Sequence, residues 1–362
     1  MNDYDVSLAE KSPLIPSFDK ASLTKESPEK ESSEEAFSQV KLATPSAETP
    51  LTGDAQRYRV LHTTEYEYQG TVNICQNTAL LKPRTYSTPL LEQRCITSSL
   101  QITPRPDDDR THTDFFGNEV LYFALQKPHE TLTISATSVL EKHSFAPATD
   151  DFLSASEPWE RVADLVRFPY TGLTETRLYS TVLDAAQYTF PSAFAGISAE
   201  LRDYAALSFA PHRPLLEAVR DFVRRIYTDF QYVPGFTTIS TPIATVLRER
   251  KGVCQDFAHL ALGCLRSLGL AARYVSGYIE TLPPEGKERL VGADASHAWI
   301  AVFEPHLGWV EFDPTNNHLV RQQHLTVGWG RDYGDVTPIK GVMLGAATAE
   351  PEVSVDVARL VG

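Results

Sequence analysis

Cys254, His297 and Asp313 are the residues of this sequence whose types and order could carry out covalent chemistry. A cysteine thiolate can attack an acyl carbon, and a histidine can take and return the proton. An aspartate can hold the imidazole in one tautomer and stabilise its cation. The three residues therefore predict a thiol nucleophile, its base and an orienting carboxylate. Asp294 and Glu311 compete with Asp313 for the last of these roles.

Cys254 stands at the start of a predicted amphipathic helix over Val253–Leu268. Apolar side chains recur after it in steps of three and four, and Gly269 follows as a stop signal. In the first turn of a helix, unpaired N–H groups and the helix dipole favour a thiolate, and with an imidazolium nearby they can lower a cysteine pKa from about 8.5 to roughly 3.5–7.5. The alternative is a small buried hydrophobic residue, which is what we expect of Cys264 on the apolar stripe.

His297 and Asp313 lie in two segments rich in β-forming residues, His297–Phe303 and Trp309–Asp313, with a predicted hairpin loop between them. A loop of odd length centred on Pro305 places His297 directly opposite Asp313. Opposed side chains on one face have Cβ atoms about 4.5–5.5 Å apart, so an imidazole and a carboxylate could hydrogen bond. A loop of even length would put them on opposite faces. The apolar pattern favours the odd loop.

Four further residues are candidates for binding the oxyanion or the substrate: Tyr232, Gln255, Trp299 and Trp309. An oxyanion needs hydrogen-bond donors; the backbone N–H of Cys254 is one, and Tyr232 could supply a second unless it is an ordinary packed tyrosine. Trp299 and Trp309 share the non-core face of the predicted hairpin with His297, where they could line a groove for an extended peptide. Alternatively, a neighbouring β-domain covers both tryptophans, and they hold the domains together.

Five sequence blocks resemble the bacterial branch of the transglutaminase-like superfamily, a group of papain-like thiol enzymes. They are Phe230-x-Tyr-x-Pro-Gly, Gly252-Val-Cys-Gln-Asp-Phe-Ala-His-Leu, Ala272-Arg-Tyr-Val-Ser-Gly-Tyr, Ser296-His-Ala-Trp and Trp309-x-x-x-Asp-Pro-Thr. Further blocks between Tyr58 and Asn118 are similar to the N-terminal β-domain of that branch, and residues 331–342 are similar to its C-terminal segment. The resemblance implies a catalytic triad of Cys254, His297 and Asp313.

The chain of 362 residues divides into four predicted segments. Residues 1–55 are acidic and poor in aromatic side chains, so we expect a disordered tail, or alternatively a docking arm. Residues 56–145 alternate in short strand-like runs and predict an antiparallel β-sandwich. Residues 146–195 bridge to a core at 196–362, where helices precede strands and Glu352–Arg359 reads as a final strand. The predicted class is α+β, with a papain-like or transglutaminase-like core.

Composition excludes several function classes. The net charge of −14 argues against nucleic acid or an anionic membrane surface as a partner. No apolar run approaches the roughly 20 residues of a membrane span, and acidic residues interrupt any signal peptide, so we expect a cytoplasmic protein. Four scattered cysteines fit a reducing compartment. Nothing in the sequence has the ligand spacing of a zinc or calcium site, and we expect neither a metal nor another cofactor.

The same triad serves more than one reaction. A thioacyl intermediate can be resolved by water, as in a peptidase or amidase, or by an amine, as in a transglutaminase. The resemblance favours hydrolysis of peptide or isopeptide-like amides, with a peptide or protein as the substrate. A non-catalytic binding module is a third possibility, and it would require a broken triad. The sequence indicates neither the natural substrate nor the oligomeric state.

Overall fold

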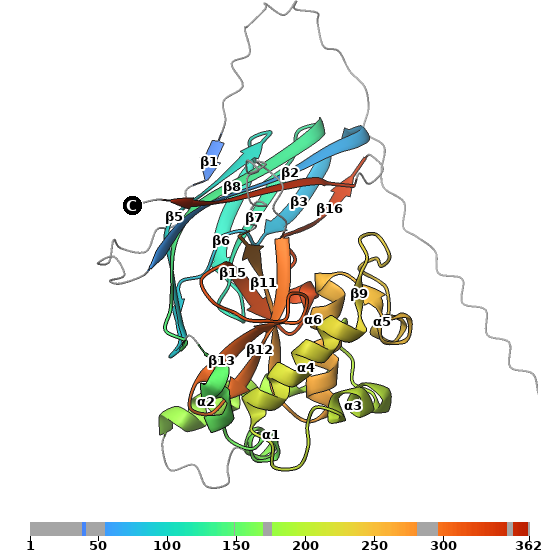
Figure 1. Ribbon diagram of the computed structural model, residues 1–362. Coiled ribbons are helices and arrows are strands. Elements are labelled where there is room, and N and C mark those ends of the chain that lie inside the picture. The colour runs from blue at the N-terminus through green and yellow to red at the C-terminus, as the bar shows by residue number, and fades with distance from the viewer. Residues whose placement is uncertain are drawn as a thin grey trace, which may run out of the picture. The chain divides into compact units, whose positions relative to one another are not determined.

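A computed structural model describes residues 55–147, 149–168, 176–280, 296–345 and 350–360, with the backbone alone at 38–40 and 176–179. All of these residues lie within the unit Phe37–Gly362 (Figure 1). The tail predicted at 1–55 lies almost wholly outside the described residues, as does Asp294.

An antiparallel β-sandwich forms the first part of the fold, as the alternating strands predicted. One sheet has the order β1 (Ser38–Val40), β5 (Leu91–Thr103), β8 (His129–Ser144), β2 (Gln56–Val72) and β17 (Glu352–Leu360), with β4 (Tyr86–Ser87) beside β5. The other has the order β16 (Ile339–Leu344), β3 (Ile74–Ala79), β7 (Glu119–Leu125) and β6 (Asp108–Thr113). Alternate residues such as Leu100 and Ile102 of β5 and Leu121 and Phe123 of β7 are buried in one apolar cluster. Alternation along a strand sends every second side chain to the inner face of a sandwich.

The last two strands belong to this sandwich, which corrects the predicted core boundary of 196–362. β17 pairs with β2, with Val357 opposite Val60, and β16 pairs with β3 (Figure 1). Val355 and Val357 of β17 are buried. An alternating pattern identifies a strand and its buried face, but not the sheet that it joins.

Short helices connect the sandwich to the core within the predicted bridging segment. They are η1 (Asp150–Ala155), α1 (Trp159–Arg167), α2 (Thr176–Ala186) and η2 (Gln187–Thr189). Val162 and Val166, one helical turn apart on α1, are both buried, so this amphipathic helix packs through one apolar face.

A five-stranded antiparallel sheet forms the core. Its order is β14 (His318–Leu319), β13 (Gly308–Asp313), β12 (Ser296–Glu304), β11 (Ala272–Ile279) and β15 (His324–Gly330), followed in the chain by η3 (Tyr333–Asp335). The helices of the core are α3 (Ala199–Ala206), α4 (Leu215–Asp229), α5 (Ile243–Glu249) and α6 (Cys254–Ser267). The predicted helix Val253–Leu268 and the predicted strands His297–Phe303 and Trp309–Asp313 correspond to α6, β12 and β13 to within a few residues, whereas α5 and β15 were not predicted.

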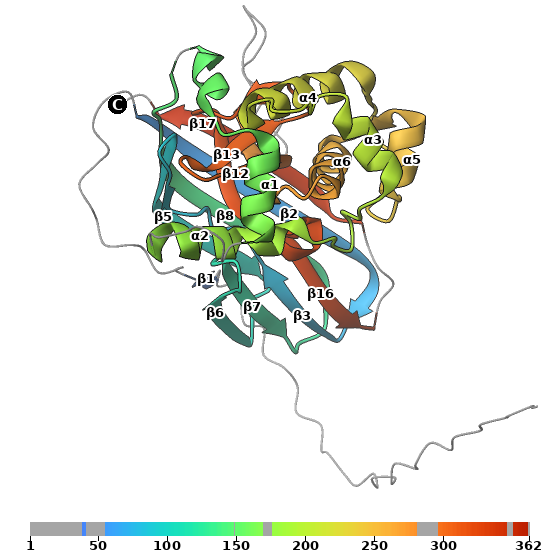
Figure 2. The same cartoon turned by 90° about the horizontal axis from the view of Figure 1, so that it is seen from below.

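Helix α6 lies at the centre of the core, against β11 and β12 and in contact with α3, α4 and α5 (Figures 1 and 2). Its residues from Asp256 to Arg266 are all buried. At Gly263 a Cβ atom would lie 2.6 Å from the carbonyl oxygen of Gly196, so only glycine permits the close approach of that segment. This enclosure fixes the position of the first turn, where Cys254 lies.

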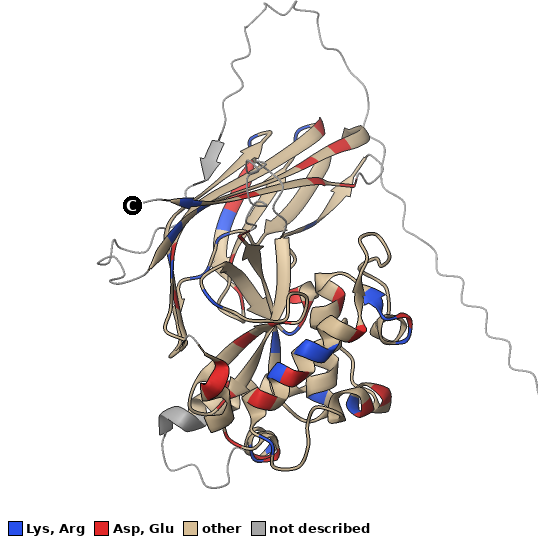
Figure 3. Ribbon diagram, viewed as in Figure 1, with Lys and Arg blue, Asp and Glu red and all other residues tan. Residues whose placement is uncertain are grey.

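The outer helices carry charges of both signs, and Figure 3 shows Lys and Arg mixed with Asp and Glu along α4. Arg224 and Asp221 pair there across one turn, as do Arg213 and Glu217 at its start. Among the described helices, none is both long enough and apolar enough to cross a membrane.

Candidate active site

A backbone turn connects β10 to α6 and places Cys254 at the first position of the helix. β10 (Lys251–Gly252) runs parallel to β9 (Gln231–Tyr232), and the helix begins two residues later. The Asp256 carboxylate accepts a hydrogen bond of 2.8 Å from the N–H of Val253, which caps the helix. A Cβ atom at Gly252 would lie 2.8 Å from the Asp256 side chain. Glycine at that position therefore permits the turn.

Cys254 differs from the other three cysteines in its exposure. All four are unpaired, but Cys75, Cys95 and Cys264 are buried, whereas Cys254 is half-buried. Burial raises the pKa of the Cys95 thiol to about 11 and also raises that of Cys264, which keeps both protonated at neutral pH. Cys254 is thus the cysteine that a reagent or a substrate can reach.

His297, at the start of β12, joins Cys254 to Asp313. Its Nε2 donates to Asp313 Oδ2 at 2.8 Å, and the Cys254 side chain lies near enough to the ring to act on its pKa. Burial alone would lower the pKa of His297, but the hydrogen bonds and charges of Asp313 and Cys254 outweigh it and raise the pKa to about 10. Because Nε2 serves the carboxylate, Nδ1 is the ring nitrogen left for a second partner.

Asp313 is fully buried and accepts hydrogen bonds from both sides. Its Oδ1 accepts from the N–H groups of Thr315 at 2.9 Å and Asn316 at 3.2 Å. Its Oδ2 accepts from Nε2 of His297, from Nε2 of His324 at 3.0 Å and from Nδ2 of Asn316 at 2.7 Å. Burial would raise the pKa of Asp313, yet the two histidines outweigh it and hold the pKa well below the ordinary value. The carboxylate is therefore ionised at neutral pH.

The predicted register of the hairpin is wrong by two residues, although the predicted faces are right. The loop is the odd-length Pro305–Leu307, and Ile300 lies opposite Phe312. His297 and Asp313 are consequently diagonal neighbours on one face and not directly opposed. A shift of two residues leaves every side chain on its face, so an alternating pattern cannot distinguish the two registers. The φ of +69° at Gly308 suits the turn that sets the observed one.

His324 and Asn316 complete the surroundings of Asp313, and neither was predicted. Asn316 follows Asp313-Pro-Thr, a sequence typical of an aspartate that caps its own turn, and this signal could have identified it. His324 opens β15, a strand that pairs with β11 and not with β13. No spacing rule along the sequence connects it to Asp313.

Trp299 does not line a groove, which corrects one of the substrate-binding predictions. It is fully buried, and its Nε1 donates to Glu311 Oε2 at 2.8 Å. A Cβ atom on Gly277 of β11 would lie 2.6 Å from the Trp299 ring, so glycine there makes room for the indole. The face of the hairpin that carries Trp299 is therefore interior.

The β-sandwich covers this interior face. Tyr86 of β4 donates from its hydroxyl to Glu311 Oε1 at 3.2 Å and accepts from Nζ of the buried Lys142 of β8 at 2.6 Å. Trp309 is only half-buried, but the Arg273 guanidinium lies over its ring at 4.4 Å and Tyr188 packs edge-on at 5.1 Å. Trp309 thus packs between the core and η2, and its role in substrate binding stays a prediction.

Tyr232 and Gln255 lie close to the thiol, one on each side of it in the chain. Tyr232 of β9 pairs with Gly252 of β10, and its side chain is half exposed. The centroids of the Tyr232 and Phe257 rings are 6.4 Å apart. Partial burial, and then the charges of Cys254 and Asp256, raise the pKa of Tyr232, so its hydroxyl stays a donor at neutral pH. Gln255 is half-buried in the first turn of α6. Their roles in binding stay predictions.

His297, Asp313 and His324 also bring three potential metal-ligand atoms within 4.8 Å of one another. The contacts of 2.8 and 3.0 Å to Asp313 have the lengths of charge-assisted hydrogen bonds, and all three residues are buried. Hydrogen bonding of both histidines to the ionised Asp313 carboxylate accounts for the short distances among these three side chains.

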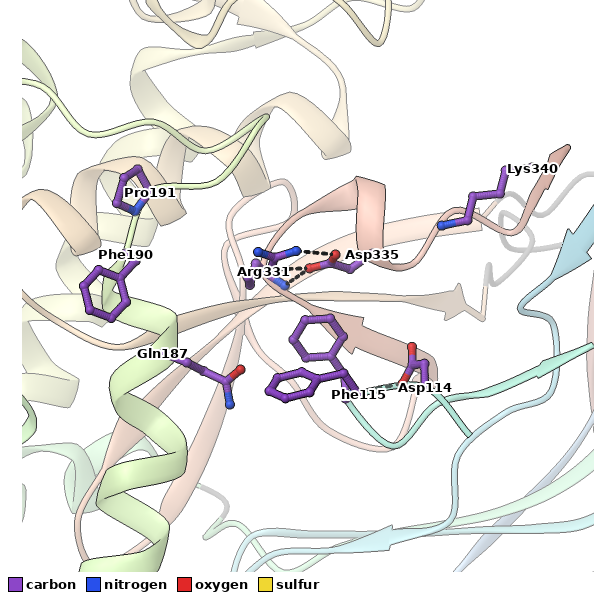
Figure 4. A pocket seen from close by; sticks show the side chains of 9 residues that line it. Asp114, Phe115, Gln187, Phe190, Pro191, Arg331, Asp335 and Lys340 are labelled. Atoms are coloured by element: carbon purple, nitrogen blue, oxygen red, sulfur yellow. Dashed lines mark hydrogen bonds and ion pairs between the residues drawn. The ribbon is translucent and has the colours of Figure 1, made fainter. Parts of the chain in front are cut away.

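A cavity of about 650 Å³ lies where three segments meet, and its lining contains no member of the Cys254–His297–Asp313 group. Figure 4 shows Phe115 from the turn before β7, Phe190 from the segment after η2, and Arg331 bound to Asp335 through two hydrogen bonds. Phe115 and Phe190 are exposed. Asp335 already neutralises the Arg331 charge in this cavity.

Comparison with known proteins assigns the chain to a family. Residues 203–314 match the transglutaminase-like superfamily, and residues 58–141 match the bacterial transglutaminase-like N-terminal region. An uncharacterised protein of Mycobacterium tuberculosis (strain H37Rv) is 43% identical over 318 residues, which cover 86% of this chain and 96% of that protein. A protein-glutamine gamma-glutamyltransferase of Pseudomonas aeruginosa is 39% identical over 67 residues, 18% of this chain and 10% of that protein.

A solved structure shares the fold. The crystal structure of a candidate cysteine protease from Cytophaga hutchinsonii has a TM-score of 0.63 and 19% identity, and the match covers 90% of this chain and 94% of that one. Together with the half-buried cysteine at the start of α6 and the antiparallel sheets, these matches establish that the chain belongs to the transglutaminase-like superfamily.

Proposed function

We propose that this protein hydrolyses peptide or isopeptide-like amide bonds through a thioacyl-enzyme, with Cys254 as the nucleophile, His297 as the base and Asp313 as the orienting carboxylate. The observation that carries the proposal is the placement of His297 between a half-buried thiol, whose nearness acts on the pKa of the ring, and a fully buried, ionised carboxylate to which it is hydrogen bonded. An activated nucleophile requires a base beside the thiol and a group that orients the base, and this placement supports those roles for His297 and Asp313.

The contacts suggest how each step proceeds. His297 takes the thiol proton and, as an imidazolium stabilised by Asp313, returns it to the leaving amine. The raised pKa of His297, about 10, favours this charged form at neutral pH. The N–H of Cys254 has no intrahelical acceptor at the first position of α6, so it is available to the oxyanion. Tyr232 is proposed as the second donor. Water then resolves the thioacyl group, with His297 acting as the base again.

Two observations support water as the acceptor. Trp299 and Trp309 are held by interior partners, so neither forms an aromatic wall that excludes water from Cys254. The Cytophaga hutchinsonii protein of the same fold is named as a candidate protease. Transfer to an amine is the second candidate, because the segment shared with the Pseudomonas aeruginosa gamma-glutamyltransferase favours it.

A glutaminyl peptide incubated with the protein and a fluorescent primary amine separates the two reactions. Hydrolysis yields the glutamyl peptide at a rate independent of the amine, whereas transfer yields the fluorescent peptide. To extend the test to other amides, the same mixture is repeated with a panel of peptide and isopeptide amides, and acyl adducts on Cys254 are sought by mass spectrometry. Cys254→Ala is the control. A Cys254 that forms no adduct and no product with any amide would point to a binding module.

A further inference from the structure

A second cavity, of about 360 Å³, is lined in part by His324, the residue that hydrogen bonds with Asp313. Its lining contains neither Cys254 nor His297. Its polar lining comes from η1, α4, the turn around β14 and the start of β15. The residues used below are Asp150, Arg220, Asn317, Arg321 and His324.

Two guanidinium groups face one carboxylate in this cavity. Asp150 accepts from Nε of Arg220 at 3.2 Å and from Nη2 of Arg321 at 3.4 Å. Arg220 also donates to Asn317 Oδ1 at 2.5 Å. Two positive charges against one negative charge leave these three side chains with a formal charge of +1 (2 − 1). Both guanidinium groups are only partly exposed, at 29% and 34% of their side-chain surface, so they are partly shielded from water.

His324 supplies the second, independent observation. It is 2% exposed, and its Nδ1 is buried without a hydrogen-bond partner among the described residues. A buried polar atom left without a hydrogen bond destabilises the fold, so it points to a missing partner. Since Nε2–H donates to the ionised Asp313, Nδ1 of the neutral ring is an acceptor and requires a donor.

We propose that this cavity binds a singly protonated phosphate group, either inorganic phosphate or a phosphate monoester, between Arg220, Arg321 and His324. Such a group offers negative oxygens to the guanidinium groups and an O–H to Nδ1, whereas a carboxylate offers only the first. The volume of about 360 Å³ has room for a monoester. A donor to Nδ1 also polarises the ring and strengthens the Nε2–H bond to Asp313, so occupancy acts on the group that orients His297.

Binding is measured on the full chain by melting temperature and by 31P NMR titration, with inorganic phosphate, O-phosphoserine and acetate at an ionic strength fixed with chloride. We expect saturable binding of one or both phosphates and none of acetate. Arg321→Gln and Arg220→Gln should each weaken binding about ten-fold or more. Arg224→Gln is the matched control, since it removes an exposed arginine one turn away on the same helix. His324→Gln keeps a donor toward Asp313 and removes Nδ1, so it should also weaken binding.

Equal phosphate affinity in the wild type, Arg220→Gln and Arg321→Gln, or no phosphate binding by the wild type, would overturn the site. Acetate binding as tightly as phosphate would overturn the role of His324 Nδ1. The link to Asp313 is tested by the rate at which iodoacetamide alkylates Cys254, which saturating phosphate should change in the wild type but not in His324→Gln. An unchanged rate would overturn that link. None of these measurements requires turnover, so their failure is distinct from failure of the proposed hydrolysis.

Discussion

At the scale of single residues, the environment separates cysteines and carboxylates that look alike in the sequence. Cys254 and Cys264 lie on the same helix, yet one begins it at the surface and the other is buried in its apolar stripe. Asp313 and Glu311 lie on the same face of β13, yet Asp313 binds two histidines while Glu311 binds Trp299 and Tyr86. Reactivity should follow these contacts.

Iodoacetamide at neutral pH should label Cys254 before any other cysteine, because Cys75, Cys95 and Cys264 are buried. Cys254→Ala should abolish turnover and leave the melting temperature nearly unchanged. Cys264→Ala should lower the free energy of unfolding by about 1 kcal/mol or more through lost buried volume, with activity per folded molecule kept. Mass mapping of the labelled peptides is the measurement. Faster labelling of Cys264 would show that the nucleophile is wrongly assigned.

Asp313→Asn should lower kcat by roughly three to four orders of magnitude, because an amide favours the wrong tautomer of His297. The asparagine oxygen can still accept from the N–H groups of Thr315 and Asn316, so the turn should persist. Glu311→Gln is the matched control on the same strand and face. It should lower stability more than kcat, because it leaves the buried charges of Lys142 and Arg273 without their carboxylate. The reverse ranking in kcat would contradict the assignment.

At the scale of elements, the sequence predicted α6 and the strands of the hairpin but not how the elements meet. Apolar steps of three and four marked α6, and alternation marked β12 and β13. A two-residue shift leaves the same alternation unchanged, so the pattern could not fix the register. The register is known only from the structure, where the chain turns at Gly308. His324 was missed because β15 reaches Asp313 through strand order and not through sequence spacing.

The contact between α6 and η3 predicts a dependence of stability on pH. Burial lowers the pKa of His259 to about 4, and its Nε2 accepts from the N–H of Tyr333 at 3.1 Å. An unfolded histidine titrates near pH 6.5. Between pH 6.5 and 4 the unfolded chain therefore binds a proton that the native chain does not, and the free energy of unfolding falls by up to about 1.4 kcal/mol per pH unit as pH falls. The stabilisation is complete above pH 6.5 and is lost as the pH approaches 4.

His259→Gln should make this dependence shallower, since glutamine can accept from the Tyr333 N–H and does not titrate. Urea unfolding at several pH values between 4 and 7 is the measurement. His306→Gln serves as the control because the His306 side chain is 68% exposed. A slope that is unchanged in His259→Gln would mean that another group is responsible.

At the scale of the whole molecule, the β-sandwich covers the face of the core hairpin that carries Trp299 and Glu311. Gln93 of β5 donates to the carbonyl of Thr326 at 2.7 Å and accepts from its N–H at 2.9 Å, as a neighbouring strand would. His62 of β2 hydrogen bonds with Tyr278 of β11 at 3.0 Å. Composition and alternation predicted both layers. Their contact could not be predicted, because it depends on buried polar pairs far apart in the chain.

Trp299→Ala tests whether this covered face is structural. The loss of a fully buried indole should lower the free energy of unfolding by about 3–5 kcal/mol. Phe115→Ala, at an aromatic residue that is 82% exposed, is the control and should change it by about 0.5 kcal/mol or less. Thermal and urea unfolding give the comparison. A Trp299→Ala protein of normal stability with a reduced kcat/KM would support the original prediction that Trp299 lines a substrate groove.

The pairing of β17 with β2 also constrains biosynthesis. Chains emerge from the ribosome N-terminus first, and early domains often fold during translation. Here β2, at residues 56–72, lacks one neighbour until residues 352–360 have been made, after the entire core. The nascent chain therefore carries an open strand edge through most of its synthesis, the kind of edge that chaperones shield and that otherwise pairs wrongly. The sandwich, although it begins before the core in the sequence, can be completed only after the core has been made.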